Sequence, residues 1–187
     1  MSSLKFLLQY ITRPRTVGAV LPSSKYLARK MVMGVDFERA AYVVEYGPGT
    51  GVFTDEILRG LGSDAKLLLL ERNPDFAALL ERKYEAYENV TVVNDTAEQV
   101  GKYLNMYSIP KADYVLSGLP FASLPNEVSE NILKETMKIL AEGGKFITFQ
   151  YSLLRKDLFS RHFPEITITR EFRNIPPAYV LSCTKRE

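Results

Sequence analysis

The chain has 187 residues, of which 46% are hydrophobic and 25% charged; this composition predicts one globular domain and excludes a disordered or collagen-like chain. No apolar run approaches the roughly 20 residues that a transmembrane helix needs. The single cysteine, Cys183, excludes an intramolecular disulfide, and its apolar neighbours predict a core position in a protein of a reducing compartment.

The net charge of +2 is unevenly distributed along the chain. Residues 1–35 contain six basic residues and no acidic one, so all 22 acidic residues lie beyond residue 35. A basic segment joined to an acidic body suggests a polyanion or an anionic membrane surface as partner. The six basic residues are Lys5, Arg13, Arg15, Lys25, Arg29 and Lys30.

The first 34 residues predict two helices. Apolar residues at positions 4, 7, 8 and 11 have the spacing of one helical face, which predicts an amphipathic helix. A second helix is expected from Pro22 through Met33, with Ser23 or Ser24 near its N-cap and Gly34 at its end. The first helix could bind a membrane surface or cover the sheet. We expect 1–34 to be a basic N-terminal segment and 35–187 the core of the same domain.

From residue 41 onward, short apolar runs alternate with helical patterns. Near-continuous apolar runs are typical of strands buried on both faces of a parallel sheet, so the alternation predicts a doubly wound α/β fold. Two last strands, separated by a segment with two prolines, predict an antiparallel hairpin that closes the sheet. The predicted strands are 41–46, 66–71, 90–94, 114–117, 145–151, 165–173 and 179–185, and the predicted helices are 52–61, 75–86, 96–104 and 126–141.

A glycine-rich turn follows the first of these strands, with Glu45 before it and glycines at 47, 49 and 51. Glycine allows a ligand to approach the backbone, and the amides at the start of the next helix can face a polar ligand. A P-loop would need a lysine here, and the dinucleotide fingerprint would need glycine where Val52 stands. The remaining pattern, acid-x-Gly-x-Gly-x-Gly, resembles the first motif of the class I S-adenosylmethionine-dependent methyltransferases.

This resemblance implies a Rossmann-like fold with a seven-stranded, mostly parallel sheet of order 3-2-1-4-5-7-6. It implies S-adenosylmethionine as cofactor, S-adenosylhomocysteine as product, and no metal. Glu45 would hold the methionine end, Glu71 would accept bonds from the ribose hydroxyls, and Asp95 would take the adenine amine. The cofactor-binding residues that it implies are Val20, Leu21, Glu45, Tyr46, Gly47, Gly49, Thr50, Gly51, Glu71, Arg72, Asp95, Thr96 and Ser117.

Two branches of these enzymes share longer motifs with the chain. The segment 18–24 is partly similar to the G-Q-N-F-L-x-D motif of the rRNA adenine N6-dimethyltransferases, whose fourth motif is N-[LIP]-P-[YFW]. Alignment on Leu119-Pro120-Phe121 puts Gly118 at the position of that asparagine, while Phe121 keeps an aromatic ring that could stack on a base. The helical RNA-binding domain of those enzymes has no counterpart in this sequence.

The second branch is the short bacterial phospholipid N-methyltransferases. Residues 13–24 resemble their R-x-x-x-x-GA-[VI]-x-PSS signature, residues 117–120 their SGLP motif, and residues 174–178 their N-[IL]-P-P-A stretch. These matches are longer than those to the rRNA branch. They imply methylation of the phosphatidylethanolamine amine by a cytoplasmic protein that binds the membrane peripherally. Methylation of rRNA adenine, methylation of a small-molecule amine, and cofactor binding without catalysis remain alternatives.

Methyl transfer requires alignment of a nitrogen lone pair with the methyl–sulfur bond, and an alkylammonium acceptor must first lose a proton. The residues expected at the transferring methyl group and the acceptor are Tyr26, Ser117, Gly118 and Phe121. The candidates for the base are Tyr26, Glu45, Tyr46, His162 and Tyr179. The position of His162 near a helix end also fits a surface or capping role.

Overall fold

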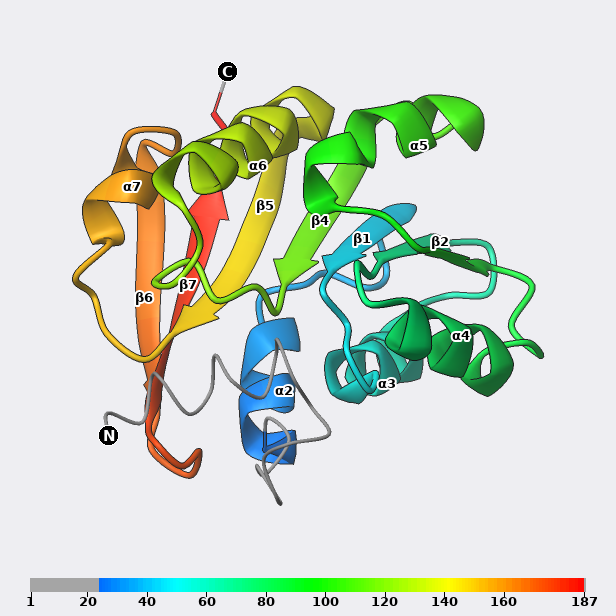
Figure 1. The fold of residues 1–187 in the computed structure, drawn as a ribbon, viewed down its shortest axis with the longest axis horizontal. Helices are drawn as coiled ribbons and strands as arrows, with labels where there is room; N and C mark the ends of the chain where they lie inside the picture. The colour runs from blue at the N-terminus through cyan, green and yellow to red at the C-terminus, as the bar shows by residue number, and fades with distance from the viewer. Residues whose placement is uncertain (1–23, 187) are drawn as a thin grey trace.

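The computed structural model describes residues 24–186, which form one seven-stranded sheet with helices on both faces (Figure 1). The strand order is β3-β2-β1-β4-β5-β7-β6, as the sequence predicts. Neighbouring strands from β3 to β5 are parallel, and β7 is antiparallel to both β5 and β6. The strands are β1 (Tyr42–Tyr46), β2 (Lys66–Leu70), β3 (Val90–Val93), β4 (Ala112–Ser117), β5 (Leu140–Gln150), β6 (Glu165–Glu171) and β7 (Ala178–Thr184).

The apolar runs form strands because both faces of the sheet are covered. Successive residues of β1, Val43 and Val44, enter different hydrophobic clusters because they point to opposite faces of the sheet. One cluster includes α2 (Lys25–Val32), α3 (Val52–Gly60) and α4 (Pro74–Lys83). The other includes the short η1 (Ala97–Gln99), α5 (Val100–Met106), α6 (Asn126–Ile139) and α7 (Lys156–Ser160). Cys183 lies in the second cluster and is fully buried, which confirms its predicted core position.

The main departure from the predicted elements is at the junction of α6 and β5. The predicted helix extended to residue 141, but α6 ends at Ile139 and β5 begins at Leu140. Gly143, with φ of +74°, lies within this early part of β5, and the register against β4 shifts nearby. The two glycines at 143 and 144 weaken the apolar pattern by which a strand is recognised, so the sequence predicted only the part from residue 145.

Helix α2 is held against the β6–β7 hairpin by its cap. Ser24 Oγ accepts a hydrogen bond from Leu27 N at 3.2 Å, which confirms a serine N-cap. The Ser24 amide donates to Asn174 Oδ1 at 3.1 Å, and Asn174 Nδ2 donates to the Pro176 carbonyl at 2.7 Å. The buried Asn174 side chain therefore joins the start of α2 to the turn of the hairpin.

The carboxyl ends of β1 to β5 share one edge of the sheet, beside α2 (Figure 1). The turn between β6 and β7 is at the same edge, because Tyr179 pairs with Gln150 at the end of β5, and Ala178 pairs with Glu171 at the end of β6. The expected amphipathic helix at 4–11, together with Val20 and Leu21, lies outside the described residues. Within residues 24–186, no helix is long and apolar enough to cross a bilayer.

We expect Asn174→Ala to lower the free energy of unfolding by about 1–3 kcal/mol, because it removes the buried acceptor of the Ser24 amide and a donor to the turn. Asn131→Ala, which removes an exposed hydrogen bond to Glu98, is the matched control and should cost less. Urea unfolding monitored by circular dichroism measures both variants. Equal losses for the two would contradict a structural role of the Asn174 side chain.

Candidate active site

The glycine-rich turn between β1 and α3 lies at the carboxyl edge of the sheet. Gly47, Gly49 and Gly51 all have positive φ, of +63°, +58° and +84°. A Cβ atom on Gly51 would also overlap the Tyr84 hydroxyl, so this position excludes any larger residue. The turn therefore presents its backbone at the place where the sequence predicts a ligand.

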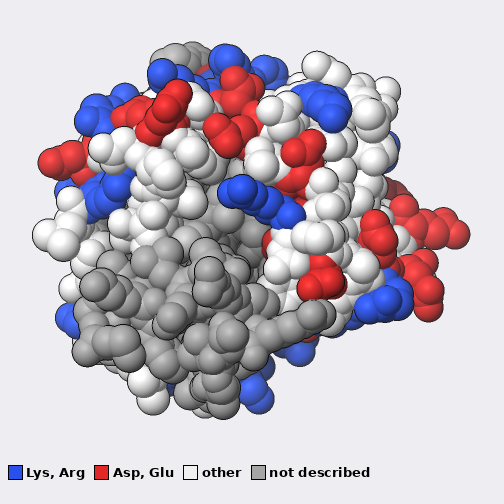
Figure 2. Space-filling view, in the orientation of Figure 1, with Lys and Arg blue, Asp and Glu red and all other residues white. Residues whose placement is uncertain are grey.

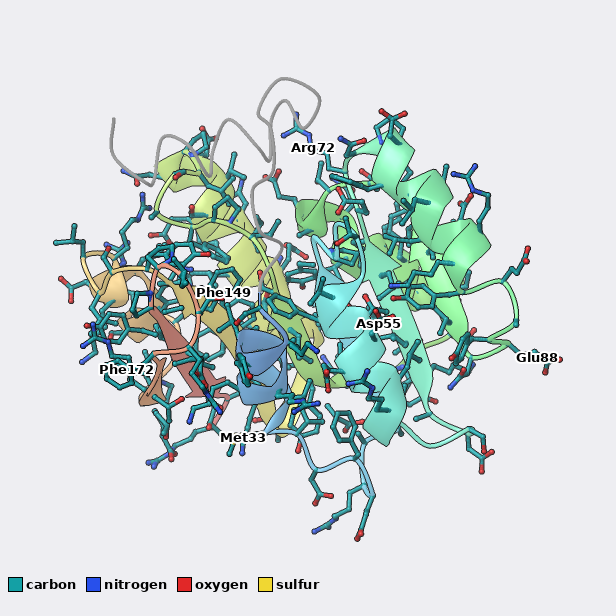
Figure 3. All side chains as sticks on the ribbon, turned by 90° about the horizontal axis from the view of Figure 1, so that it is seen from below. Met33, Asp55, Arg72, Glu88, Phe149 and Phe172 are labelled. Atoms are coloured by element: carbon teal, nitrogen blue, oxygen red, sulfur yellow. The ribbon has the colours of Figure 1, made fainter. Side chains whose placement is uncertain are left out.

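Glu71, directly after β2, fixes the middle of this turn. Its Oε2 accepts a hydrogen bond from Gly49 N at 3.0 Å, and its Oε1 accepts one from Asn73 N at 2.8 Å. The carboxylate is thus beside the glycine-rich turn, as its predicted ribose role requires, and it braces the loop as well. The next residue, Arg72, is exposed at the rim of this edge (Figure 3).

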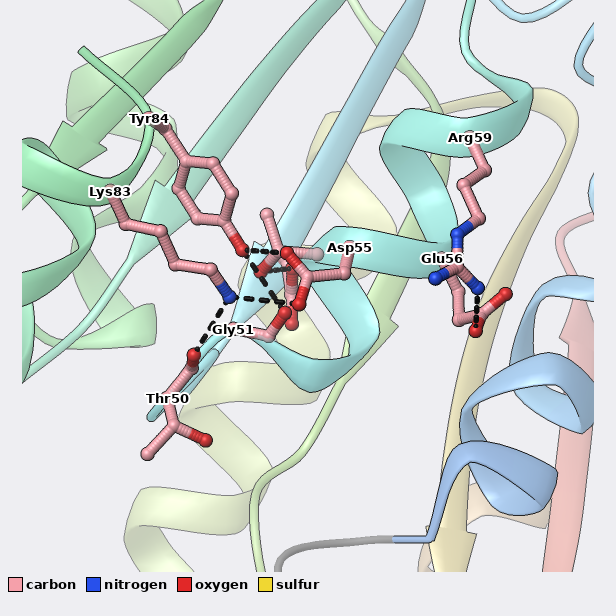
Figure 4. A network of polar contacts seen from close by, with 9 residues as sticks. Thr50, Gly51, Asp55, Glu56, Arg59, Lys83 and Tyr84 are labelled. Atoms are coloured by element: carbon pink, nitrogen blue, oxygen red, sulfur yellow. Dashed lines mark hydrogen bonds and ion pairs between the residues drawn. The ribbon is translucent and has the colours of Figure 1, made fainter.

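The end of α4 fixes the other side of the turn (Figure 4). The Tyr84 hydroxyl donates to the Gly51 carbonyl at 3.0 Å and to Asp55 Oδ1 at 2.8 Å. Lys83 Nζ donates to the Thr50 carbonyl at 3.2 Å and to Asp55 Oδ2 at 2.8 Å. Burial, together with its bond to Asp55, raises the pKa of the Tyr84 hydroxyl, so this tyrosine stays protonated and remains a donor. The Thr50 and Gly51 carbonyls and the first turn of α3 are thereby held in one network.

Glu45 is fully buried under the turn. Its Oε2 accepts a hydrogen bond from Thr54 Oγ1 at 2.7 Å, while Oε1 has no partner among the described residues. Burial raises the pKa of this carboxyl to about 8. A buried oxygen without a partner is costly, and a cationic ligand over the turn would lower this pKa and pair with the ionised carboxylate. This side chain therefore fits a ligand that carries a positive charge.

Asp95 and Asn94 terminate β3 at the same edge. Asp95 accepts from its neighbour Thr96 N at 2.7 Å and from the Tyr103 hydroxyl at 2.8 Å, and these bonds lower its pKa. The Thr96 amide, expected near the adenine ring, is thus engaged by Asp95 itself. Asn94 Nδ2 donates to the Glu71 carbonyl at 2.8 Å, which connects the ends of β2 and β3.

The end of β4 packs directly on the glycine-rich turn. Gly118 N donates to the Tyr46 carbonyl at 2.9 Å, and a Cβ atom on Gly118 would lie only 2.8 Å from the Gly47 carbonyl oxygen. Ser117 is fully buried, and its Oγ accepts a hydrogen bond from Leu119 N at 3.2 Å. Position 118 therefore has no space for a side chain while the backbone stays as it is.

Two aromatic predictions do not match the structure. Phe121 was expected to offer its ring to an acceptor, but it is fully buried and packs edge-on against Phe146 and Phe159, with ring centroids 6.0 and 5.2 Å apart. Tyr46 was a candidate base, but its hydroxyl bonds Thr136 Oγ1 at 3.2 Å inside the core, and burial raises its pKa. Only the Tyr46 backbone reaches the site.

The remaining candidate bases are dispersed. His162 Nε2 is 2.7 Å from Glu130 Oε2 of α6, and the residue precedes β6 at the edge of the sheet away from the glycine-rich turn. Its side chain is only 13% exposed, so it is not a surface residue. Tyr179 is half-buried at the carboxyl edge, opposite Gln150. Tyr26 is partly exposed on α2, with the Arg173 guanidinium 4.4 Å from its ring centroid. Tyr26 and Tyr179 therefore remain candidates for the proton acceptor.

Comparison with known proteins agrees with this geometry. A model of the family described as ribosomal RNA adenine dimethylase matches residues 21–162. The chain belongs to this family. It is 34% identical to an ornithine lipid N-methyltransferase from Singulisphaera acidiphila over 95% of this chain and 93% of that protein. It is 28% identical to a ribosomal RNA small subunit methyltransferase A from Hydrogenobaculum sp. over 70% of this chain and 50% of that protein.

The fold is also similar to that of solved methyltransferase structures. A S-adenosylmethionine-dependent O-methyltransferase from Thermotoga maritima superposes with a TM-score of 0.64 at 17% identity, covering 97% of this chain and 71% of that one. The chain is therefore a S-adenosylmethionine-dependent methyltransferase with the class I fold that the sequence predicted. The buried Glu45 oxygen fits this cationic cofactor, and the turn leaves open space at Gly49, where an added Cβ would meet no atom within 4 Å.

The sequence did not predict the supports of the glycine-rich turn. Lys83 and Tyr84 occur at the end of α4, more than 30 residues from the carbonyls they bond. In the sequence they resemble ordinary surface residues of an amphipathic helix. The local signal was Gly51, because a glycine at this position allows another group to pack closely against the backbone. In the structure that group is the Tyr84 hydroxyl.

We expect Glu71→Gln to weaken S-adenosylmethionine binding at least about tenfold, equivalent to about 1.4 kcal/mol, because it removes the charge from the acceptor beside Gly49 and the expected ribose site. Isothermal titration calorimetry measures this affinity. Glu81→Gln, on the exposed side of α4, is the control and should bind as the unmodified protein does. Unchanged affinity for Glu71→Gln would remove the ribose assignment.

Glu45→Gln tests the buried carboxyl through pH. The pKa of Glu45 is about 8 in the folded protein against an ordinary 4.5, so between these values the folded state retains a proton that the unfolded state has lost. Stability of the unmodified protein should therefore fall as pH rises from about 4.5 to about 8, whereas the glutamine variant lacks this component. Thermal unfolding of both proteins at pH 5 and pH 8 measures the difference. The same pH dependence in both proteins would contradict a buried, protonated Glu45.

Proposed function

We propose that this enzyme transfers methyl groups from S-adenosylmethionine to the primary amine of a membrane-lipid headgroup. Phosphatidylethanolamine is the acceptor that the sequence motifs imply. The 34% identical relative is named for an ornithine lipid, which also presents an amine on a lipid headgroup. The shared acceptor is a primary alkylamine held at a bilayer surface.

The single observation that carries this proposal is the contact between Gly118 and the glycine-rich turn. In the rRNA enzymes that the chain resembles, an asparagine at this position reads the target adenine. Here a side chain at position 118 would approach the Gly47 carbonyl oxygen to 2.8 Å at its first atom. The amide that would bind an adenine amine is absent, and Phe121 does not supply the stacking ring. An alkylamine needs neither group.

Different residues of this chain would bind the cofactor, align the acceptor and remove its proton. Glu45 would face the positively charged methionine end, and Glu71 the ribose, with Asp95 at the adenine end. The bound cofactor supplies an electrophilic methyl group on a sulfonium, and its neutral thioether leaves without acid assistance. Ser117 and Gly118 would border the acceptor nitrogen, so they would align its lone pair with the methyl group.

The acceptor must arrive as a free amine, and a tyrosine at the carboxyl edge could take or relay its proton. Tyr179 is the better placed of the two remaining candidates, because it pairs with the last residue of β5 beside β4. Tyr26 lies on α2. An arginine lies over each of the two rings, with Arg173 at 4.4 Å from the centroid of Tyr26 and Arg170 at 5.0 Å from that of Tyr179.

Incubation with methyl-labelled S-adenosylmethionine and vesicles tests the proposal. Vesicles that contain phosphatidylethanolamine or ornithine lipid should yield labelled lipid, whereas vesicles of phosphatidylcholine alone, which has no free amine, should not. Chromatography of the extracted lipid identifies the product. Absence of label in both amine-containing lipids would reject the proposed acceptor class.

Gly118→Ala should reduce methyl transfer to the lipid amine by about a hundredfold or more, equivalent to about 2.7 kcal/mol, because the added Cβ pushes the end of β4 away from the glycine-rich turn. Gly62→Ala is the matched control, since a Cβ there meets no atom within 4 Å, and it should retain activity. Initial rates with the active lipid measure both. Full activity of Gly118→Ala would contradict the requirement for this close approach.

A further inference from the structure

The turn between β6 and β7 exposes large apolar side chains to water. Phe172 is 67% exposed and Ile175 is 80% exposed, and Pro176 and Pro177 after them are exposed as well. A single exposed apolar residue is ordinary on a protein surface. Here all four residues lie within the one short turn between β6 and β7, and Phe172, Ile175, Pro176 and Pro177 are together called the apolar projection.

Buried polar residues hold this turn in place. Glu171 accepts hydrogen bonds from Arg173 N and Nε, both at 2.9 Å, and from its Nη2 at 3.2 Å. These bonds lower the pKa of Glu171 to about 2, so the pair remains charged on both sides across the physiological range. Asn174 binds the turn to α2. These bonds fix the backbone of the turn that carries Phe172 and Ile175.

Cationic groups surround the apolar projection. The Arg170 guanidinium lies 4.7 Å from the ring centroid of Phe172, and that of Arg173 lies over Tyr26 of α2. Lys25 at the start of α2 is exposed, and the acid within the turn, Glu171, is buried and paired with Arg173. Exposed apolar side chains with arginine and lysine nearby match the interface of a bilayer, where acyl chains lie beneath phosphate groups.

The projection is at the same edge of the sheet as the glycine-rich turn and the end of β4. Figure 1 shows the β6–β7 turn extending past the ends of the parallel strands, beside α2. Figure 3 looks onto this edge, with Phe172 at its periphery. Leu154, in the loop that leaves β5 at this edge, is 91% exposed. A surface that contacts the projection would thus face the edge where methyl transfer is proposed.

One end of the molecule is acidic. In the view of Figure 2, acidic side chains gather at the right-hand side, toward α4, and basic and acidic groups are mixed elsewhere. An anionic bilayer would repel this acidic end.

We propose that the β6–β7 turn, residues 171–177, docks the enzyme on a phospholipid bilayer. Phe172 and Ile175 enter the interfacial region, and Arg170 and Arg173 meet the lipid phosphates. The biological purpose of this docking rests on the proposed lipid methylation, but the docking itself depends only on the surface just described. The proposed membrane contact lies near the C-terminal end of the chain, far in sequence from the basic N-terminal segment.

The chain contains no tryptophan, so one introduced tryptophan reports on its own surroundings. The probe is Phe172→Trp, and the control is Met106→Trp, because Met106 is 60% exposed at the end of α5 on the opposite edge. The vesicles contain phosphatidylcholine with a minority of phosphatidylglycerol, so they offer no amine acceptor. Addition of vesicles should shift the emission of Phe172→Trp to shorter wavelength, and brominated acyl chains should quench it. Met106→Trp should change in neither respect.

Unchanged emission from Phe172→Trp, or an equal shift in both proteins, would overturn the proposal. A paired variant, Phe172→Ser with Ile175→Ser, separates docking from methylation. It should lose most of the methyl transfer to lipid in vesicles yet keep that to a dispersed short-chain lipid amine. If the emission shifts but no lipid is methylated by the unmodified enzyme, the docking stands and the proposed function fails. If short-chain lipid is methylated without a shift, the function stands and the docking fails.

Discussion

The site depends on the close approach of two backbone segments at the carboxyl edge of the sheet. The end of β4 touches the turn after β1 through Gly118, whose missing side chain lets the Gly47 carbonyl come near. Around this contact, Glu71 holds the Gly49 amide and Tyr84 holds the Gly51 carbonyl. Because each bond fixes backbone rather than side chain, the turn keeps its shape without large residues.

The proposed acceptor depends on the same contact. Relatives of the chain include both rRNA methyltransferases and an ornithine lipid N-methyltransferase, so family membership alone leaves the acceptor open. The end of β4 differs in chemistry between the two branches that the sequence resembles. A glycine at position 118, with Phe121 withdrawn into the core, favours a flexible alkylamine over a planar base that requires reading and stacking groups.

The sequence predicted the fold because its signals are local. Apolar runs buried on both faces produced the strands, and the glycine spacing after Glu45 identified the turn and its class of enzyme. The errors arose where position depends on distant residues. Phe121 follows a motif in which the aromatic residue is expected at the site, yet it packs on Phe146 and Phe159, which come from later elements. In the same way, Tyr84 is recognisable as a support only once α4 is placed beside α3.

The central claim is that this member of the family methylates a lipid amine rather than an RNA base. A competition between the two acceptors measures it most directly. One reaction combines the enzyme and methyl-labelled S-adenosylmethionine with vesicles and unmethylated ribosomal RNA. The vesicles contain phosphatidylethanolamine, ornithine lipid and some anionic lipid. Extraction then separates lipid from RNA. The account predicts label in the lipid fraction and none in adenine. Label in RNA adenines would contradict it and would show that the glycine at position 118 does not exclude a base.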